Sequence, residues 1–259
     1  MHFGLISVLS AAALFLGMLL FSEIGRRIGL ARLARDSEGL TKGAATAEAA
    51  VFGLLGLLIA FTFSGAASRF EDRRHLIADE TNAIGTAYLR LDILPPDAQP
   101  QLRELFRHYT DVRATVYHNA ADQALTKARL DEGAALQGEI WRTALAALQQ
   151  PGTPPQAITF VLAALNEMFD ITETREAATR NHPPLIVFLL LSGLSLMGAL
   201  LVGYGTSTSV HRSWLHTVTY AAILSLTVYV IADLEFPRLG LIRVDTADQP
   251  LVELRQSMQ

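Results

Sequence analysis

Few residues of this sequence have the types and spacing needed for chemistry, and the first such group is acidic. Asp233, Glu235 and Asp245 lie in a short run where acids alternate with large apolar residues and arginines, directly after an apolar segment. A ring of such carboxylates beside a pore mouth would attract cations. The alternative for Asp233 and Glu235 is that they form ion pairs with Arg238, Arg243 or the arginines after the second apolar segment.

A second group is a row of bulky apolar residues in and beside the apolar segment at residues 49–63. At about 100° per residue, Phe52, Ile59 and Phe63 fall on one side of a helix, with Glu48 near the end of the row. Facing a water-filled axis, this row would make a hydrophobic constriction that closes by dewetting, with Glu48 at one mouth. The alternative is that the phenylalanines face lipid or a neighbouring helix, and that Glu48 is a helix-end residue at the membrane interface.

Small side chains form a strip beside this row. Small residues let helices approach closely inside a membrane, where packing contacts drive association because lipid is as apolar as leucine. The strip therefore predicts a helix-packing seam, either within the chain or between subunits. Its members are Ala49, Gly53, Gly56, Ala60 and Ser64.

Catalytic and cofactor motifs are missing from the sequence. It has no Gly-rich phosphate loop, dinucleotide fingerprint, HExxH or GxSxG motif. It has no cysteine, and none of its seven histidines has another at the third or fourth position along. We therefore predict no enzyme activity, no cofactor and no metal site. The net charge of −4, with no basic block, also argues against a nucleic-acid partner.

The elements that must position these residues are four apolar segments, at residues 3–21, 49–63, 185–202 and 215–232. Each is close to the ~20 apolar residues with which a helix crosses a bilayer. The first is interpreted as a retained helix rather than a signal peptide, because it has no basic residues before it and no small-residue cleavage site after it. The sequence thus predicts a multi-pass membrane protein whose first partner is the lipid bilayer.

The polar stretch between the second and third apolar segments has helical periodicity. One stripe holds Ile77, Ile84, Tyr88 and Leu91, and a later stripe begins at Ile158. We predict an all-α fold of four transmembrane helices, with a helical soluble domain inserted between the second and third. The predicted boundaries are residues 1–68 for the first helix pair, 69–183 for the soluble domain, 184–232 for the second pair and 233–259 for a polar carboxyl-terminal tail.

Four spans place both termini and the central domain on one side of the membrane. The basic residues of the first loop, residues 22–42, favour a cytoplasmic position for that loop. Comparable numbers of arginines flank the other ends of the spans, so charge alone leaves the orientation open.

Three runs of the sequence carry a family resemblance: DETNAIGTAYLRLDILP at 79–95, LNEMFDITET at 165–174 and DLEFPRLGLIRVD at 233–245. With the four-span layout, they resemble the bestrophin-like family of uncharacterised bacterial membrane proteins over nearly the whole chain. The resemblance implies a remote link to bestrophins, which are pentameric chloride channels with four membrane helices per subunit and a helical cytosolic domain. It also implies a cytoplasmic central domain and cytoplasmic termini, which we adopt.

The resemblance implies roles for two of the groups above. Bulky apolar side chains on the second membrane helix narrow the bestrophin pore, and Phe52, Ile59 and Phe63 match them in type, although their spacing departs from the regular one-turn spacing of that neck. The acidic cluster that binds calcium in animal bestrophins has only a loose counterpart after the fourth segment, so we assign no calcium site.

The first hypothesis is therefore an oligomeric ion channel of the bacterial inner membrane, a homo-oligomer of five or so subunits that passes inorganic ions along an axis lined by the second membrane helix. The acidic residues favour cations, whereas the resemblance favours chloride. The alternative is a non-conducting membrane-anchored sensor or scaffold, which binds a protein partner through its helical domain.

Overall fold

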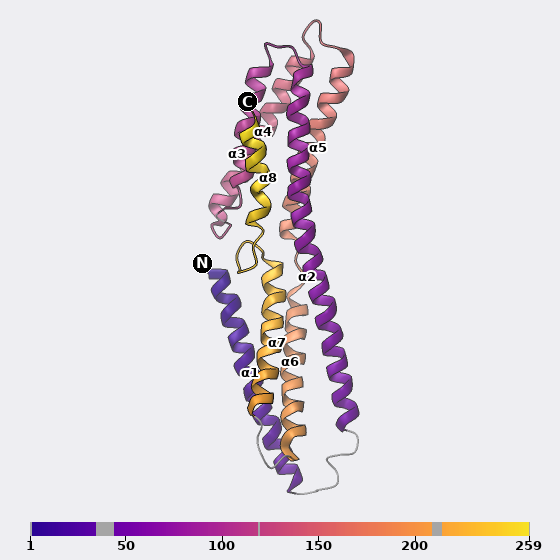
Figure 1. Cartoon of the computed structure of the whole chain (residues 1–259), viewed down its shortest axis with the longest axis vertical. Coiled ribbons are helices and arrows are strands. Elements are labelled where there is room, and N and C mark those ends of the chain that lie inside the picture. Colours follow the sequence, from indigo (N-terminus) through magenta and orange to yellow (C-terminus); the bar gives the residue numbers. More distant parts are fainter. Residues whose placement is uncertain (1, 35–43, 119, 209–213, 259) are drawn as a thin grey trace. The chain divides into compact units, whose positions relative to one another are not determined.

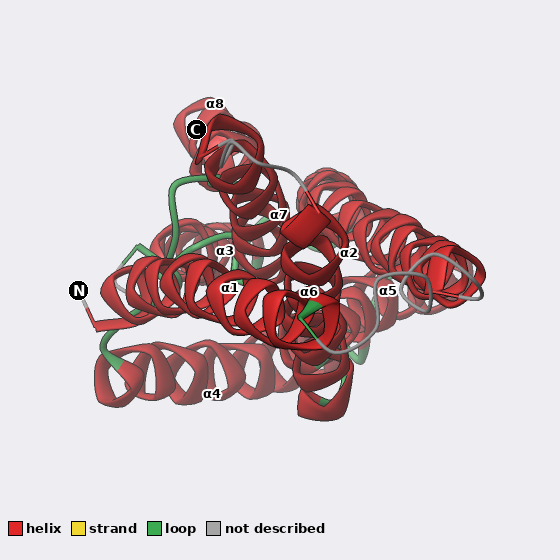
Figure 2. Cartoon of the chain, turned by 90° about the horizontal axis from the view of Figure 1, so that it is seen from below, coloured by secondary structure: helices red, strands yellow, loops and turns green. Residues whose placement is uncertain are grey.

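The computed structural model describes residues 2–34, 44–118, 120–208 and 214–258, and these residues form helices and connecting turns with no strand (Figure 2). Several helices begin after a proline or at one, as α5 does, because proline is tolerated in a helix only at its first turn. The elements are α1 His2–Leu33, α2 Ala44–Leu89, η1 Arg90–Ile93, α3 Gln99–Thr115, α4 Gln123–Leu148, α5 Pro155–Arg180, α6 Leu185–Gly205, η2 Thr206–Thr208, α7 Trp214–Glu235, η3 Asp245–Asp248 and α8 Gln249–Ser257.

The chain divides into two compact units, each built from separate stretches of sequence. The first unit holds Met1–Ser68 and His182–Phe236, and the second holds Arg69–Asn181 and Pro237–Gln259. Helix α2 contributes its first part to the first unit and its second part to the other. No proline lies between residues 63 and 91, so the helix can continue from one unit into the other.

Helix α1 of the first unit packs along α6 and also touches α7 (Figure 1). A methyl group placed on Gly25 would overlap the backbone carbonyl of Leu200, and one on Gly203 would overlap the carbonyl of Ser22. Two helices can approach this closely only where a side chain is missing, which is how small residues stabilise helix pairs in membranes. The buried side chains of Met18 and other residues fill the space alongside these crossings.

The outward faces of the first unit are apolar. Large aliphatic side chains stay exposed along all its helices, including Leu16 at 62% and Leu189 at 58%. Among the described residues, four helical stretches are long and apolar enough to cross a membrane, and they include α1, α2, α6 and α7. Their lengths and exposed apolar surfaces are those expected of helices in lipid rather than in water.

The helices extend beyond the predicted apolar segments at several points. Helix α1 continues to Leu33, so the first twelve residues of the predicted basic loop are helical. No proline interrupts this stretch, and Gly29 fits closely against Ser207 of η2. The later part of the loop, including Arg35 and Lys42, lies outside the described residues.

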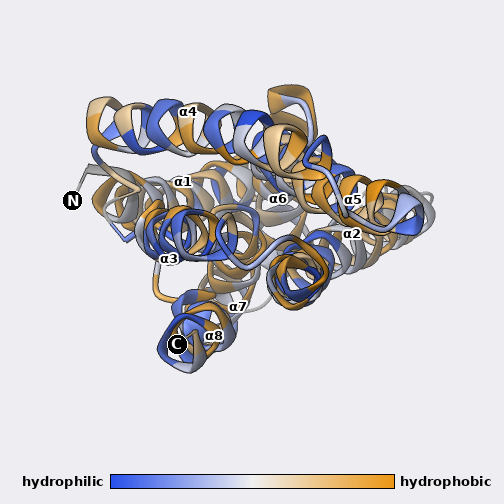
Figure 3. Ribbon diagram, turned by 90° about the horizontal axis from the view of Figure 1, so that it is seen from above, coloured by the Kyte–Doolittle hydropathy of each residue, from blue (hydrophilic) through white to orange (hydrophobic). Residues whose placement is uncertain are grey.

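The second unit has a hydrophobic core of its own, formed by the second part of α2 together with η1, α3, α4, α5 and α8. The predicted stripe on α2 is confirmed, since Ile77, Ile84 and Leu91 are all at most 2% exposed. In the later stripe, Ile158 is 48% exposed, because Ala157 is the residue that the first turn of α5 buries. Figure 3 shows hydrophilic and hydrophobic residues interspersed along α3, α4 and α5.

Residues 237–259, for which the sequence predicts only a polar tail, complete this second unit. Helix α8 lies beside α3 (Figure 1), and its Leu251 is fully buried in the common core. Elsewhere in this unit, Arg73 of α2 donates hydrogen bonds to the carbonyls of Ala178 and Asn181, at 3.2 and 2.9 Å, at the carboxyl-terminal end of α5. Such bonds satisfy carbonyls that a helix end leaves without a partner.

Candidate functional site

The bulky row on α2 has three different environments in the first unit. Phe52 packs edge to face against Tyr220 of α7, with ring centroids 6.1 Å apart, and its ring also lies beside Gly198 of α6. Ile59 is half-buried, and Phe63 is 44% exposed. The chain itself therefore anchors one end of the row and leaves the other end free to contact lipid, water or a second subunit.

The small-residue strip on α2 is uncovered within the chain. Ala49, Gly53, Gly56, Ala60 and Ser64 are all exposed. A methyl group added to Gly53 or Gly56 would meet no atom within 4 Å, in contrast to Gly25 and Gly203. The two glycines thus make no close packing contact within the described chain, and a seam between subunits stays a prediction.

Glu48 lies near the amino-terminal end of α2 and beside the end of α6. Its carboxylate is close to Gly205, where an added methyl group would come within 3.3 Å of Oε1. The side chain is half-buried. A role for this carboxylate at a pore mouth remains a prediction.

The predicted acidic group is divided between the two units and differs in burial. Asp233 and Glu235 are fully buried in the first unit, where the Tyr229 hydroxyl donates to Asp233 at 3.4 Å and His182 Nδ1 lies 3.7 Å from Glu235. Asp245 belongs to the second unit and is 46% exposed, in ion pairs with two arginines, Arg238 and Arg243. Asp245 is therefore ion-paired. A mouth formed by the other two stays a prediction.

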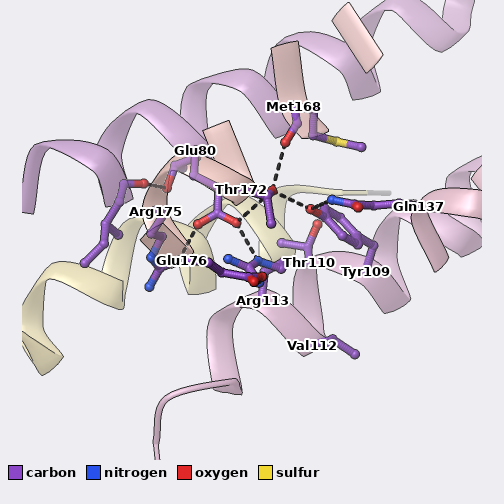
Figure 4. Close-up of polar contacts among 12 residues, drawn as sticks. Glu80, Tyr109, Thr110, Val112, Arg113, Gln137, Met168, Thr172, Arg175 and Glu176 are labelled. Carbon is purple, nitrogen blue, oxygen red and sulfur yellow. Dashed lines mark hydrogen bonds and ion pairs between the residues drawn. The ribbon is translucent and has the colours of Figure 1, made fainter. Parts of the chain in front are cut away.

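A buried network of charges occupies the interior of the second unit (Figure 4). Glu80 of α2 is fully buried, and its two carboxylate oxygens accept hydrogen bonds from Arg113 of α3 and Arg175 of α5. Arg175 also donates to Asp248 at 2.9 Å, and Arg238 donates two bonds to the same carboxylate at 2.6 and 3.0 Å. Buried ions are tolerated when they are paired and hydrogen-bonded in this way.

Neutral groups also surround Glu80, and the Thr172 hydroxyl lies 3.4 Å from its Oε1. The hydroxyls of Tyr109 and Thr172 are 2.8 Å apart, and Gln137 donates to the Tyr109 oxygen at 3.0 Å (Figure 4). The ring of Tyr117 lies under two guanidinium groups, 5.2 Å from that of Arg175 and 4.9 Å from that of Arg238. These contacts fix the cations over an aromatic face as well as against carboxylates.

The opposite charges of Glu80 and Arg113 stabilise each other's ionised forms. Burial alone would raise the pKa of Glu80, but the guanidiniums of Arg175 and Arg113 outweigh burial and hold it below its ordinary value. Burial would lower the pKa of Arg113, yet the Glu80 carboxylate outweighs it and raises that pKa. Burial also raises the pKa of the Tyr109 hydroxyl, which keeps this group a neutral hydrogen-bonding partner. Glu80 and Arg113 therefore hold each other in the ionised form at neutral pH.

The network was not predicted, although two signals for it are present in the sequence. Glu80 falls on the apolar stripe between Ile77 and Ile84, where a charged residue has to be buried. The three runs that carry the family resemblance also supply or adjoin its members, since Glu80 lies in the first, Thr172 in the second and Arg238 in the third. In the part of the chain that the structure describes, no three histidine, aspartate or glutamate side chains are grouped as a metal site would require.

Comparison with known proteins finds matches over nearly the whole chain. The family model for the Bestrophin-like domain matches residues 11–249. A crystal structure of a bacterial bestrophin homolog from Klebsiella pneumoniae, carrying a point mutation, is similar with a TM-score of 0.67 and 13% identity, over 95% of this chain and 98% of that chain. A second crystal structure of that homolog gives a TM-score of 0.64 and 16% identity, over 93% and 98%. No curated protein matches significantly.

Proposed function

Since this chain belongs to the Bestrophin-like family, we propose that it is an oligomeric ion channel of the bacterial inner membrane with α2 lining the pore. The fold that it shares with the Klebsiella homolog and its four apolar helices support a membrane protein. The family resemblance supports ion conduction rather than enzyme catalysis. Five subunits, and a cytoplasmic position for the second unit and both termini, belong to the same proposal.

The observation that carries this proposal is the bare face of α2. A methyl group on Gly53 or Gly56 would meet nothing within 4 Å among the described residues, although close helix contact is what small residues favour in a membrane. A second copy of α2 or a neighbouring membrane helix satisfies that preference. Repetition of the contact around an axis then gives a closed ring, the usual arrangement of homo-oligomers.

The adjacent bulky row supplies the gate in this proposal. Phe63 is exposed, so its ring is available to narrow an axial passage, and Ile59 lies one turn away. Phe52 is held against Tyr220 and therefore supports the position of α2. An apolar constriction of this kind blocks ions by excluding water from a narrow segment. Glu48, Asp233, Glu235 and Asp245 are the proposed charges that select ions near its ends.

The seam is tested by replacing Gly56 with leucine. A methyl group at this position would meet no atom within 4 Å in the described chain, so the subunit should insert and fold, while a leucine in the seam keeps neighbouring helices apart. Gly193→Leu is the matched control, because this α6 glycine is also exposed and has equally open surroundings. Measured by native mass spectrometry, wild type and Gly193→Leu should form one oligomer of about five subunits, and Gly56→Leu smaller species. A wild-type monomer would refute the proposal.

Conduction is tested in liposomes with chloride and potassium gradients imposed separately. Wild type should pass one ion selectively, and Phe63→Ala should raise the flux several-fold because it removes bulk from the constriction. Leu189→Ala, an outward substitution on α6, should leave flux unchanged. Equal flux from wild type and the alanine variants of Phe52, Ile59 and Phe63 would refute the gate. No flux from correctly inserted oligomers would favour the membrane-anchored scaffold.

A further inference from the structure

Helix α2 meets α6 and α7 through bulky side chains. Phe52 is half-buried and Leu55 is 3% exposed, whereas Gly53, which lies between them in the sequence, is exposed. Both bulky side chains lie near Gly198 of α6, since a methyl group on that glycine would be 3.2 Å from the Phe52 ring and 3.7 Å from Leu55. The contact of α2 with its neighbours therefore depends on how large side chains fit around residue 198.

Tyr220 of α7 reaches the same glycine. A methyl group on Gly198 would lie 2.6 Å from the Tyr220 hydroxyl oxygen, about 1 Å closer than ordinary van der Waals contact. The Tyr220 ring also packs edge to face against Phe52, with ring centroids 6.1 Å apart. Tyr220 can hold this position only because residue 198 has no side chain. One glycine thus accommodates aromatic side chains from two other helices of the first unit.

The Tyr220 hydroxyl is not placed there by a hydrogen bond. Its oxygen is buried and has no hydrogen-bond partner among the described residues. The hydroxyls of Ser195 on α6 and Thr227 on α7 instead donate to carbonyls one turn back, at 2.8 and 2.9 Å. Because a buried hydroxyl without a partner costs free energy, polarity does not explain the place of this group. What the hydroxyl contributes is its volume, which fills the space beside Gly198.

We infer that Tyr220 is a positioning residue for α2: packed against both Gly198 and Phe52, it sets how far α2 lies from α6 and α7. The bulky row continues from Phe52 to Ile59 and Phe63 on one side of the same helix. Because a helix moves as a stiff element, a displacement at Phe52 is passed on to the rest of the row. The link to the gate rests on the proposed function, whereas the positioning of α2 does not.

Two substitutions with opposite effects on the space at residue 198 test this inference. Gly198→Ala adds a methyl group that must displace the Tyr220 hydroxyl, and overpacking of this kind forces side chains and backbone to shift. Tyr220→Phe removes the hydroxyl and leaves room for that methyl group. The double variant should therefore pack like wild type, since changes that conserve volume are tolerated best. Gly193→Ala is the matched control, because a methyl group on this α6 glycine would meet no described atom within 4 Å.

The position of α2 is measured by fluorine NMR of a trifluoromethyl label on Leu57→Cys, with the protein in lipid nanodiscs. The chain has no other cysteine, and Leu57 is 53% exposed on α2. Gly198→Ala should shift the resonance of the label, whereas the double variant and Gly193→Ala should give the wild-type resonance. An unshifted resonance in a folded Gly198→Ala protein would overturn the inference. A double variant that folds and resonates no more like wild type than Gly198→Ala does would also overturn it.

Ion flux in liposomes then tests whether the position of α2 affects the gate. Gly198→Ala should change the wild-type flux by about fivefold, and addition of Tyr220→Phe should restore it to within about twofold, since residues in contact are energetically coupled. Wild-type flux from Gly198→Ala with a shifted resonance would overturn the link to the gate. A resonance that shifts and is restored, in proteins none of which conducts, would refute the channel and support the positioning of α2 by Tyr220.

Discussion

The membrane part of α2 and the interior of the second unit differ in how far a single chain completes them. Along α2, a methyl group added to Gly53 or Gly56 would have no neighbour within 4 Å in the part of the chain that the structure describes. Around Glu80, the principal charged groups are at most 4% exposed and are paired with residues from α2, α3, α5 and the carboxyl-terminal segment. Folding of one chain pairs the charges around Glu80, whereas the glycine face of α2 is left for contacts with lipid or another subunit.

The two regions differ in how strongly they restrict the arrangement of the helices around them. A charge buried among apolar helices is tolerated only in the arrangement that pairs it, so the network restricts the second unit to one helix arrangement. A bare glycine face has no such requirement in the single chain, and lipid can cover it. Surfaces that are left bare in one chain are therefore better candidates for function than the groups that the fold already satisfies.

Removal of the Glu80 charge is the strongest way to break this comparison. Glu80→Gln leaves Arg113 and Arg175 buried without their shared carboxylate, and we expect the second unit to lose about 3 to 5 kcal/mol of stability. Urea unfolding followed by the fluorescence of Trp141, in a Trp214→Phe background, reports on this unit, since each unit holds one of the two tryptophans.

Glu71→Gln is the matched control on the same helix. Glu71 pairs with Arg74 at 3.0 Å, but both side chains are about half exposed. Exposed pairs of this type contribute less than about 1 kcal/mol. A Glu80→Gln protein as stable as the control would mean that the network contributes no more than a surface ion pair.

Two glycines of the first unit sharpen the comparison within the membrane helices. Gly203→Ala places a methyl group on the Ser22 carbonyl, so α1 and α6 must move apart, and we expect a loss of about 1 to 3 kcal/mol. In Gly53→Ala the added methyl group meets no described atom within 4 Å, so this variant should be neutral or slightly stabilising in the isolated subunit. Thermal unfolding of the dissociated protein, followed by Trp214 fluorescence in a Trp141→Phe background, checks both. Equal losses would show that α2 packs within the chain.

The helices could be predicted from sequence because their apolar patterns are local. Segments 185–202 and 215–232 lie within α6 and α7, and the stripe from Ile77 to Leu91 is buried as predicted. The closest helix contact in the first unit was missed. Gly25 and Gly203 each look like an isolated small residue, and only the folded chain brings them against another backbone.

The buried network could be predicted only in part. Because Glu80 lies on an apolar stripe, its carboxylate can be predicted to be buried. The stripe does not indicate which cations form ion pairs with it. Arg113 and Arg175 are 33 and 95 positions away, and Asp248 is a further 73 positions from Arg175. Pairings over such distances depend on how the helices pack, which one sequence does not specify.

The pH dependence of stability is the smallest effect and isolates the Glu80 charge from packing. Because the pKa of Glu80 in the folded protein lies below its ordinary value of 4.5, this carboxylate stabilises the fold fully above that value. The stabilisation is lost as pH falls through the lowered pKa, since the folded protein must then take up a proton.

Urea midpoints measured from pH 7 down to pH 3 should therefore fall more steeply for wild type than for Glu80→Gln, so that the two proteins converge in acid. Glu71→Gln should stay close to wild type over the whole range, because a half-exposed ion pair contributes little to stability. Parallel curves for wild type and Glu80→Gln would mean that the variant loses stability through altered packing. The charge of Glu80 would then have no net part in holding α2, α3 and α5 together.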